Sequence, residues 1–196
     1  MDAVAVYRSD DPPARERLIE ELRRYALVIG EVTLTSGARA AYYVDAKRAI
    51  LRPPGFAALA ALLGAQLSDW QATAVGGMTM GADPVACAAL AGGARVKAFF
   101  VRKEAKAHGL QRRIEGPPLN AEDRCVVVED VVTTGGSTLA AIQALHDADR
   151  QICGVISVLD RLAGGGIAIE RAAGAPYVAL TTIDDVYPER PDREAG

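Results

Sequence analysis

The stretch that decides the fold is Arg124-Cys125-Val126-Val127-Val128-Glu129-Asp130-Val131-Val132-Thr133-Thr134-Gly135-Gly136-Ser137-Thr138. Its residues 125–128 form a short apolar block that is typical of a central strand in a parallel sheet. Residues 133–137 are rich in glycine and hydroxyl groups, and residues 139–145 carry apolar side chains at three-residue intervals. The stretch therefore predicts a buried strand, two acids, a small-residue turn and the start of a helix.

Small residues between a strand and a helix favour the binding of a phosphate group. Glycine lets the backbone approach a phosphate closely, and a helix start offers unpaired N–H groups and the positive end of its dipole. The hydroxyls of Thr133, Thr134 and Ser137 add donors. Glu129 and Asp130 stand at the carboxyl end of the strand, where they can accept hydrogen bonds from the vicinal hydroxyls of a ribose. We therefore expect a phosphate site with a sugar site beside it.

Two common nucleotide-binding loops do not fit this turn, because it lacks the Lys of the Walker A motif and the G-x-G-x-x-G pattern. The stretch instead resembles the phosphoribosyl-pyrophosphate (PRPP) motif of the type I phosphoribosyltransferases, in which two acids and two apolar residues precede Thr-x-Gly-x-Ser/Thr. An ordinary βα turn with surface acids is the alternative. The resemblance implies that PRPP is bound by Glu129, Asp130, Val131, Val132, Thr133, Thr134, Gly135, Gly136 and Ser137.

The pattern along the chain predicts an α/β fold in which helices flank a mainly parallel central sheet, with a small N-terminal cap. We expect helices over residues 14–28 (ended by Gly30), 53–68, 83–92, 137–148 and 162–172. We expect strands over 72–75, 96–101, 125–129, 152–159 and 177–181, and a hairpin over 31–35 and 41–45. The chain should form one domain, residues 1–196, with the cap at 1–50, the α/β core at 51–183 and a flexible, frayed tail at 184–196.

Composition narrows the class of protein. The chain has 196 residues, half of them hydrophobic, and a net charge of −3, so we expect no broad nucleic-acid-binding face. No apolar stretch reaches membrane-spanning length, and Met1 is not followed by the basic and apolar segments of a secretory leader. Cys87, Cys125 and Cys153 are predicted to be buried free thiols. These features predict a cytoplasmic protein with no membrane partner.

A second informative segment is a basic loop that follows the predicted strand 96–101. Arg102, Lys103, Lys106 and His108 lie within seven residues. Because ligands of parallel sheets sit beyond the carboxyl ends of the strands, this loop is expected at the same edge as residues 76–81, 129–137 and 160–161. Concentrated positive charge there suits a polyanionic leaving group. A solvated charged loop is the plainer interpretation.

Three motifs together resemble the orotate phosphoribosyltransferases over about residues 15–182. The first is Arg-Lys-Glu-Ala-Lys-x-His-Gly at 102–109, upstream of the PRPP motif. The second is Ser36-Gly37 followed by the aromatic pair Tyr42-Tyr43, which is similar to the cap motif of that family. The third is Asp160-Arg161 after the strand 152–159. The family's reaction converts PRPP and orotate into orotidine 5′-monophosphate and pyrophosphate, in de novo pyrimidine synthesis.

The resemblance implies a role for each motif. Arg102, Lys103, Lys106 and His108 would bind and neutralise pyrophosphate, and the loop would close over the site of a partner subunit in a homodimer. Mg²⁺ would bind mostly through PRPP oxygens and waters, without direct protein ligands. The residues implied to be catalytic are Lys103, Lys106, His108 and Asp130, and those implied to contact orotate are Thr133, Arg161, Tyr42 and Tyr43.

Chemistry supports these implied roles. Displacement at the anomeric carbon develops positive charge that nearby carboxylates can stabilise, and the leaving pyrophosphate gains negative charge that Mg²⁺ and the basic loop can balance. Arg161 suits the carboxylate of orotate as a bidentate partner. Either Lys106 or His108 could act as the general acid, and closure of the loop would exclude water.

Two departures and three alternatives remain open. Some family members carry a Lys where this chain has Thr35, and some carry Tyr-Lys where it has Thr79-Met80, which puts specific phosphate and orotate contacts in doubt. A purine or xanthine phosphoribosyltransferase would share the PRPP motif but lack the basic loop. A regulator that binds PRPP as a signal would usually carry a DNA- or RNA-binding surface. The length predicts no fused decarboxylase domain.

Overall fold

The computed structural model describes residues 13–33, 39–104 and 113–193. The elements along the chain are α1 (Ala14–Glu21), the π-helical turn η1 (Leu22–Ala26), β1 (Leu27–Thr33), β2 (Arg39–Val44), α2 (Lys47–Ile50), α3 (Pro53–Asp69), β3 (Ala74–Met78), α4 (Ala82–Ala91), β4 (Lys97–Val101), β5 (Ile114–Glu115), β6 (Arg124–Val132), α5 (Gly136–His146), β7 (Gln151–Asp160), α6 (Gly165–Ala173), β8 (Tyr177–Thr182) and α7 (Ile183–Val186). From α3 to β8 most strands are followed by a helix, as the sequence predicts.

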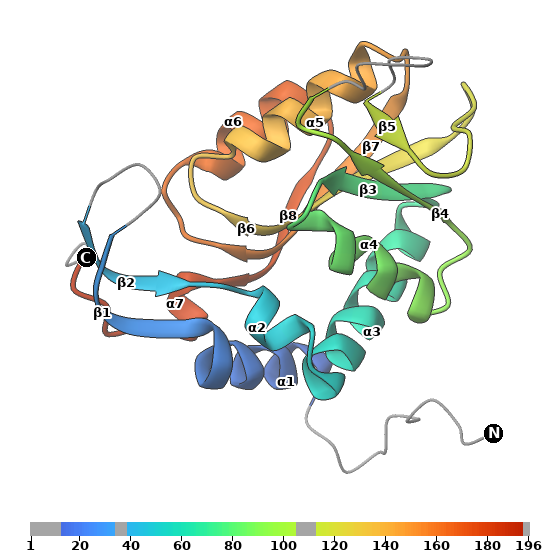
Figure 1. Ribbon diagram of the computed structural model, residues 1–196. Coiled ribbons are helices and arrows are strands. Elements are labelled where there is room, and N and C mark those ends of the chain that lie inside the picture. Colours follow the sequence, from blue (N-terminus) through green and yellow to red (C-terminus); the bar gives the residue numbers. More distant parts are fainter. Residues whose placement is uncertain (1–12, 34–38, 105–112, 194–196) are drawn as a thin grey trace.

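A six-stranded sheet in the order β5-β4-β3-β6-β7-β8 forms the centre of the molecule (Figure 1). All neighbouring strands are parallel except β5, which runs antiparallel to β4. The register pairs Val126 of β6 with Val75 of β3, and Val127 of β6 with Val155 of β7. The predicted α/β fold with a mainly parallel sheet is confirmed. The carboxyl ends of the five parallel strands therefore share one edge.

Helices cover both faces of this sheet, with α5 and α6 on one face and α3 and α4 on the other (Figure 1). Strand β6 shows the cause. Val126 and Val128 point into the core beneath α3 and α4, whereas Cys125 and Val127 point into the core beneath α5. All four side chains are completely buried. A strand covered on both sides needs apolar residues at every position, which explains the continuous apolar run in the sequence.

The N-terminal cap contains an antiparallel hairpin of β1 and β2, separate from the central sheet. The predicted hairpin is confirmed, but the predicted helix over 14–28 is wrong at its end. Helix α1 ends at Glu21, η1 follows, and Gly30 lies inside β1 with a φ of 133° instead of ending a helix. Val28 and Ile29 are β-branched and favour a strand, although the apolar spacing of the helix continues to Ala26.

The segment after β8 differs from the predicted frayed tail. Helix α7 begins with a capping box, in which the side chain of Thr182 accepts from the backbone of Asp185 and the backbone of Thr182 donates to Asp185. Arg15 of α1 pairs with the same Asp185 at 2.7 Å. The side chain of Arg190 is only 9% exposed. The acidic composition that suggested fraying is balanced by arginines, so residues 183–193 pack onto the fold.

Two simple expectations also meet the structure. No helix in the described ranges is both long and apolar enough to span a bilayer. Cys125 is buried and Cys153 half-buried, but Cys87 lies on the exposed side of α4, so the prediction of three buried thiols is wrong there. Burial raises the pKa of Cys125 to about 12, which keeps this thiol protonated and unreactive.

Candidate active site

Glu129 and Asp130 lie near the carboxyl end of β6 and are 5% and 8% exposed. The hydroxyl of Thr138, in the first turn of α5, donates to Glu129 Oε2 at 3.2 Å. Gly81, in the turn after β3, lies against both acids. A Cβ atom at Gly81 would come within 2.5 Å of Asp130 Oδ1 and 2.9 Å of Glu129 Oε1. Only glycine allows the backbone to pack this closely against the two carboxyl groups.

The electrostatics of the two acids are unequal. Burial, followed by the charge of the neighbouring Asp130, raises the pKa of Glu129 to about 8. Two adjacent buried carboxylates cannot both ionise easily, because each lowers the stability of the other's charged form. We infer that Glu129 keeps its proton to a higher pH than an ordinary glutamate does.

Lys47 pairs with Asp130. Its ammonium group lies 2.9 Å from Asp130 Oδ2 and 2.9 Å from Asp45 Oδ1. Burial alone would lower the pKa of Lys47, but hydrogen bonds and the charges of Asp130 and Asp45 raise it above its usual value. The sequence interpretation did not include this lysine. The only signal was a cation two positions after Asp45, and the contact with Asp130 spans 83 positions.

The small-residue turn after β6 has the geometry of an anion site. Gly135 precedes the first residue of α5 with a φ of +83°, a conformation that other residues rarely adopt. A Cβ there would also lie 3.1 Å from the side chain of Ile169. Thr134, Gly136 and Ser137 are exposed at the start of α5, where backbone N–H groups lack intrahelical partners. The predicted strand–turn–helix arrangement of the PRPP motif is therefore present.

Arg161 follows β7 and stands beside this turn, since its backbone N–H donates to the carbonyl of Val132 at 2.9 Å. Its guanidinium carbon lies 4.8 Å from the ring centroid of Tyr42, which belongs to the cap. The Nε of Arg161 is buried and has no hydrogen-bond partner among the described residues. A buried donor without a partner is costly and rare, so it indicates a place for a ligand that accepts hydrogen bonds.

The two cap tyrosines occupy different positions. Tyr42 is 2% exposed and packs beneath Arg161, whereas Tyr43 is 39% exposed. Neighbouring residues of a strand point to opposite faces, and the burial along β2 alternates accordingly. The structure therefore brings Tyr42 to Arg161 and turns Tyr43 to the other face of β2. In this chain the two rings do not flank one common space.

The basic loop leaves the sheet between β4 and β5. At its base, the backbone N–H of Arg102 donates to the carbonyl of Arg113 at 2.8 Å, and Arg113 Nε donates to the carbonyl of Arg102 at 3.2 Å. Arg102 and Lys103 are exposed beyond the end of β4. Lys106 and His108 lie outside the described residues, as do Thr35, Ser36 and Gly37 of the cap motif.

The turn after β3 carries the departure noted in the sequence. The hydroxyl of Thr79 donates to Asp83 at 2.5 Å, and the side chain of Met80 is 74% exposed. Asp83 lies in the first turn of α4, so the contact joins the turn after β3 to this helix and presents no cation. Met80, the chain neighbour of Gly81, therefore presents an exposed apolar side chain where some family members carry a lysine.

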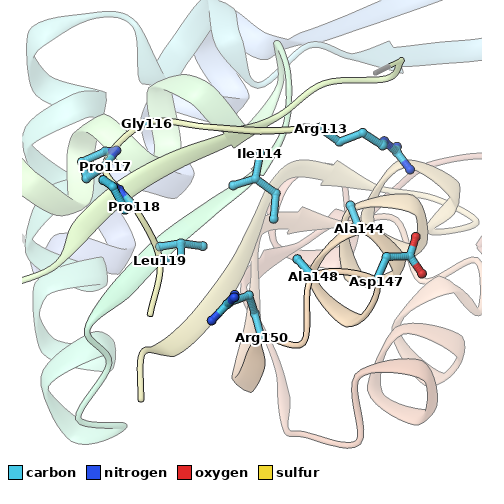
Figure 2. A pocket seen from close by; sticks show the side chains of 10 residues that line it. All are labelled: Arg113, Ile114, Gly116, Pro117, Pro118, Leu119, Ala144, Asp147, Ala148 and Arg150. Atoms are coloured by element: carbon cyan, nitrogen blue, oxygen red, sulfur yellow. The ribbon is translucent and has the colours of Figure 1, made fainter. Parts of the chain in front are cut away.

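A pocket of the molecule lies away from these residues. This pocket of about 700 Å³ opens beside β5 and the carboxyl end of α5, and Figure 2 shows the side chains around it. Its lining residues are Arg113, Ile114, Gly116, Pro117, Pro118, Leu119, Ala144, Asp147, Ala148 and Arg150. It contains neither the acids of β6 nor the start of α5, so the size of a pocket does not identify the site. The candidate functional groups lie at the carboxyl ends of the parallel strands.

The acids of β6 fit a magnesium ion only in one way. In the part of the chain that the structure describes, no three His, Cys, Asp or Glu side chains gather as a metal site. Mg²⁺ often takes one or two carboxylates, with substrate phosphates and waters as its other ligands. Glu129 and Asp130 pack closely against Gly81, so Mg²⁺ would lie near these acids with substrate oxygens and waters as its ligands.

Comparisons with known proteins identify related enzymes. The chain is 47% identical over 174 residues to the orotate phosphoribosyltransferase of Corynebacterium glutamicum, covering 88% of this chain and 94% of the relative. The orotate phosphoribosyltransferase of Mycobacterium tuberculosis in complex with Fe(III) dicitrate superimposes with a TM-score of 0.80 at 44% identity, covering 89% of this chain and 99% of the other. The same enzyme in complex with PRPP gives a TM-score of 0.76 at 39% identity, with the same coverage. No protein-family model matches the chain.

Proposed function

This chain belongs to the orotate phosphoribosyltransferase family, and from that membership we propose which of its residues hold each substrate. The chain transfers the phosphoribosyl group from PRPP to orotate, which gives orotidine 5′-monophosphate and pyrophosphate in de novo pyrimidine biosynthesis. The observation that carries the assignment is the pair of buried acids beside Gly81, directly before the turn that starts α5.

PRPP lies along the carboxyl edge of β6. Glu129 and Asp130 accept hydrogen bonds from the ribose hydroxyls, and Asp130, which pairs with Lys47, stabilises the positive charge that develops at the anomeric carbon. The residues that surround the 5′-phosphate and ribose are Val131, Val132, Thr133, Thr134, Gly135, Gly136 and Ser137. The positive-φ Gly135 and the start of α5 supply the N–H donors.

Orotate lies between this turn and the cap. Its carboxylate pairs with Arg161, whose Nε has no other partner in the described residues. Thr133 contacts the base from the turn. Tyr42 supports the Arg161 guanidinium from behind instead of flanking the base. Tyr43 faces away from Tyr42 on β2, so Arg161 and Thr133, and not Tyr43, hold the base.

Pyrophosphate leaves toward the basic loop. Arg102 and Lys103, together with Lys106 and His108, neutralise its charge, and Lys106 or His108 donates the proton that it gains. When bound through PRPP oxygens and waters near Glu129 and Asp130, Mg²⁺ balances part of the same negative charge. The loop crosses to the site of a second copy of the chain, so the working form is a cytoplasmic homodimer. Each copy acts as one domain of cap and core.

Release of pyrophosphate tests this assignment. Purified protein given PRPP, orotate and Mg²⁺ should release pyrophosphate, and removal of either substrate should stop it. EDTA should abolish the release, and added Mg²⁺ should restore it. Full activity in EDTA would overturn the magnesium proposal. Unchanged activity of Asp130→Asn would overturn the assignment of the acids.

A mixing experiment tests the shared site. A Lys103→Ala chain and an Asp130→Asn chain should each be nearly inactive alone. If the loop serves the partner's site, mixed dimers contain one site with both intact groups, and activity should return to about a quarter of the wild-type value, because half of random dimers are mixed and each has one of two sites. No recovery, although mass measurements detect mixed dimers, would contradict shared sites.

A further inference from the structure

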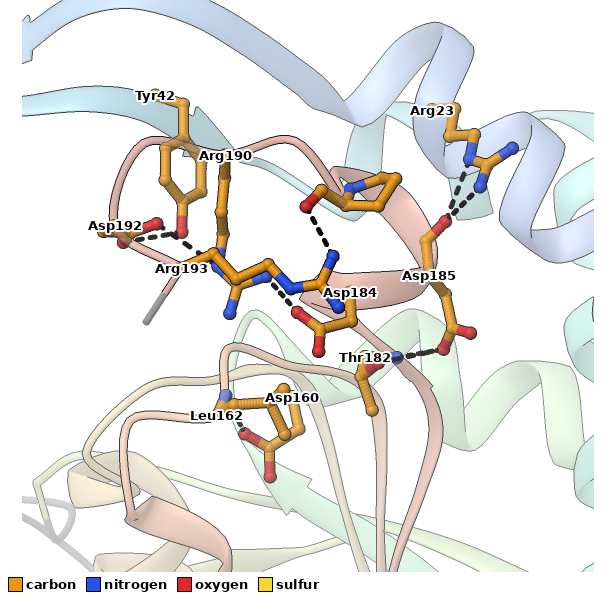
Figure 3. A network of polar contacts seen from close by, with 11 residues as sticks. Arg23, Tyr42, Asp160, Leu162, Thr182, Asp184, Asp185, Arg190, Asp192 and Arg193 are labelled. Carbon is orange, nitrogen blue, oxygen red and sulfur yellow. Dashed lines mark hydrogen bonds and ion pairs between the residues drawn. The ribbon is translucent and has the colours of Figure 1, made fainter. Parts of the chain in front are cut away.

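The segment after α7 folds back onto Tyr42 of the cap (Figure 3). The hydroxyl of Tyr42 donates to Asp192 Oδ2 at 3.0 Å. The edge of the Tyr187 ring meets Tyr42 with 5.4 Å between centroids and 84° between planes. Tyr42 also carries the guanidinium of Arg161 over its ring. This ring therefore connects the end of the chain with the residue proposed to bind the carboxylate of orotate.

Asp192 is itself held in place. Its Oδ1 accepts from Arg190 Nε at 3.2 Å, and another nitrogen of Arg190 pairs with Asp184 in α7. Although the side chain of Asp192 is 56% exposed, that of Arg190 is 9% exposed. Exposed ion pairs alone contribute little, because both side chains lose entropy in forming them. Here the buried Arg190 fixes Asp192 against α7, so the acceptor for the Tyr42 hydroxyl is preorganised.

The orientation of Arg161 depends on the ring beneath it. An arginine contributes to binding a planar carboxylate when its guanidinium plane is fixed at the right angle, and a stacked aromatic ring is one means of fixing it. The Nε of Arg161 has no hydrogen-bond acceptor within the described residues, so that atom does not fix the plane. Tyr42 is the support that the structure provides.

We propose that Asp192 is a positioning residue for orotate, which fixes the ring of Tyr42 and, through it, the guanidinium of Arg161. The inference rests on the proposed function, since it assumes that Arg161 binds the orotate carboxylate. It extends that function to residues 187–192, which form the outer support of the base site. The contacts of this segment run to the cap and to α7, and not to the turn after β6, so the effect should be confined to orotate.

Steady-state kinetics of Asp192→Ala test the proposal. The KM for orotate should rise about tenfold, on the scale of one hydrogen bond to a charged group, while the KM for PRPP stays within about twofold of wild type. Asp192→Asn keeps an acceptor oxygen and should recover most of the loss. The matched control is Arg193→Ala, because the side chain of Arg193 donates to the carbonyl of Pro188 and its loss should leave both KM values unchanged.

A double-mutant comparison separates positioning from general damage. Tyr42→Phe removes only the hydroxyl, so it should raise the KM for orotate as Asp192→Ala does, and the double variant should be no worse than either single one. Additive losses, or equal increases in both KM values, would overturn the proposal. If the Asp192→Ala protein does not fold, as judged by the loss of a cooperative unfolding transition, Tyr42→Phe becomes the deciding variant. An unchanged KM for orotate in Tyr42→Phe would then overturn the proposal. A wild-type protein that does not convert orotate would instead overturn the proposed function, and this inference with it.

Discussion

At the scale of single residues, the charge of the site is set by four side chains from two parts of the chain. Lys47, at the start of α2, contacts Asp45 beside it and Asp130 at the end of β6. Glu129 next to Asp130 stays protonated to a higher pH than an ordinary glutamate, because it is buried beside that charge. In the proposed function these two acids accept hydrogen bonds from the hydroxyls of a ribose.

Replacing Lys47 should destabilise the protein and weaken its reaction. Lys47→Ala leaves Asp130 buried without its cation, and the free energy of unfolding should fall by about 1–3 kcal/mol. This loss is smaller than the loss expected for a fully buried ion pair, because about a third of the Lys47 side chain is exposed. Urea unfolding measures this cost. Lys47→Arg keeps the charge and should recover most of the stability. A Lys47→Ala protein as stable as wild type would show that the ion pair contributes nothing.

The raised pKa of Glu129 predicts how stability depends on pH. Between about pH 4.5 and 8 the folded chain holds a proton on Glu129 that the unfolded chain has released, so the free energy of unfolding should fall as pH rises through this window. In Glu129→Gln this contribution is absent, and the fall should be smaller by an amount on the order of 4 kcal/mol, since a change of one in pKa corresponds to about 1.4 kcal/mol. Denaturant unfolding at several pH values measures both. Parallel curves for the two proteins would contradict the raised pKa.

Sequence reasoning could find some of these residues and not others. Glu129 and Asp130 stand in one continuous motif, whose residue types and order carry the chemistry. Lys47 carries no such pattern, since only the folded chain places it against an acid 83 positions away. The same limit applies to Tyr42, whose place beneath Arg161 depends on the docking of the cap. The alternation of β2 was available from the sequence and would have separated Tyr42 from Tyr43.

At the scale of elements, the turn between β6 and α5 joins the sugar site to the phosphate site. Its backbone conformation depends on Gly135, because a φ of +83° and the nearby Ile169 both exclude a side chain. Gly136 follows it without a positive φ and with open space where a Cβ would lie. A comparison of substitutions at these two glycines therefore shows whether the turn depends on the positive φ of Gly135 or only on the presence of small residues.

Gly135→Ala should reduce stability, whereas Gly136→Ala should not. A side chain in the left-handed conformation costs about 1–2 kcal/mol, and the contact with Ile169 adds to that. Alanine at position 136 lies in the first turn of α5 and should leave the free energy of unfolding the same or slightly higher. Thermal or urea unfolding of both variants checks the difference. Equal losses would mean that the conformation of Gly135 is not what the turn requires.

The elements differ in how well the sequence predicts them. Strands buried on both faces, such as β6 and β7, have continuous apolar runs and are found within a few residues. The end of α1 was missed because helical spacing persists to Ala26 while the backbone already passes through η1 into β1. The segment after β8 was missed because its order depends on pairs between distant residues, such as Arg15 with Asp185.

At the scale of the whole molecule, the cap and the end of the chain converge on one edge of the central sheet (Figure 1). The cap contributes Lys47 to the acids of the proposed PRPP site and Tyr42 to the proposed orotate site. Residues 187–192 hold Tyr42 from outside. In the proposed function both substrates contact residues that meet only when cap and core are docked, and substrate binding should stabilise the whole fold.

Binding of PRPP with Mg²⁺ should raise the melting temperature. A ligand at about one hundred times its Kd stabilises the folded state by about 2.7 kcal/mol, which for a chain of this size corresponds to roughly 5–10 °C. Differential scanning fluorimetry with and without PRPP measures the shift. The same concentrations should give a much smaller shift in Asp130→Asn. An equal shift in that variant would place PRPP away from the acids of β6.

One measurement tests the assigned reaction most directly. The absorbance of orotate is followed with purified protein, PRPP and Mg²⁺, beside parallel reactions with xanthine, hypoxanthine and adenine. We predict that orotate is consumed only when PRPP is present, and that the three purines are not consumed. Consumption of a purine with no consumption of orotate would contradict the base site formed by Arg161 and Tyr42. PRPP binding without conversion of any base would contradict the assigned enzymatic activity.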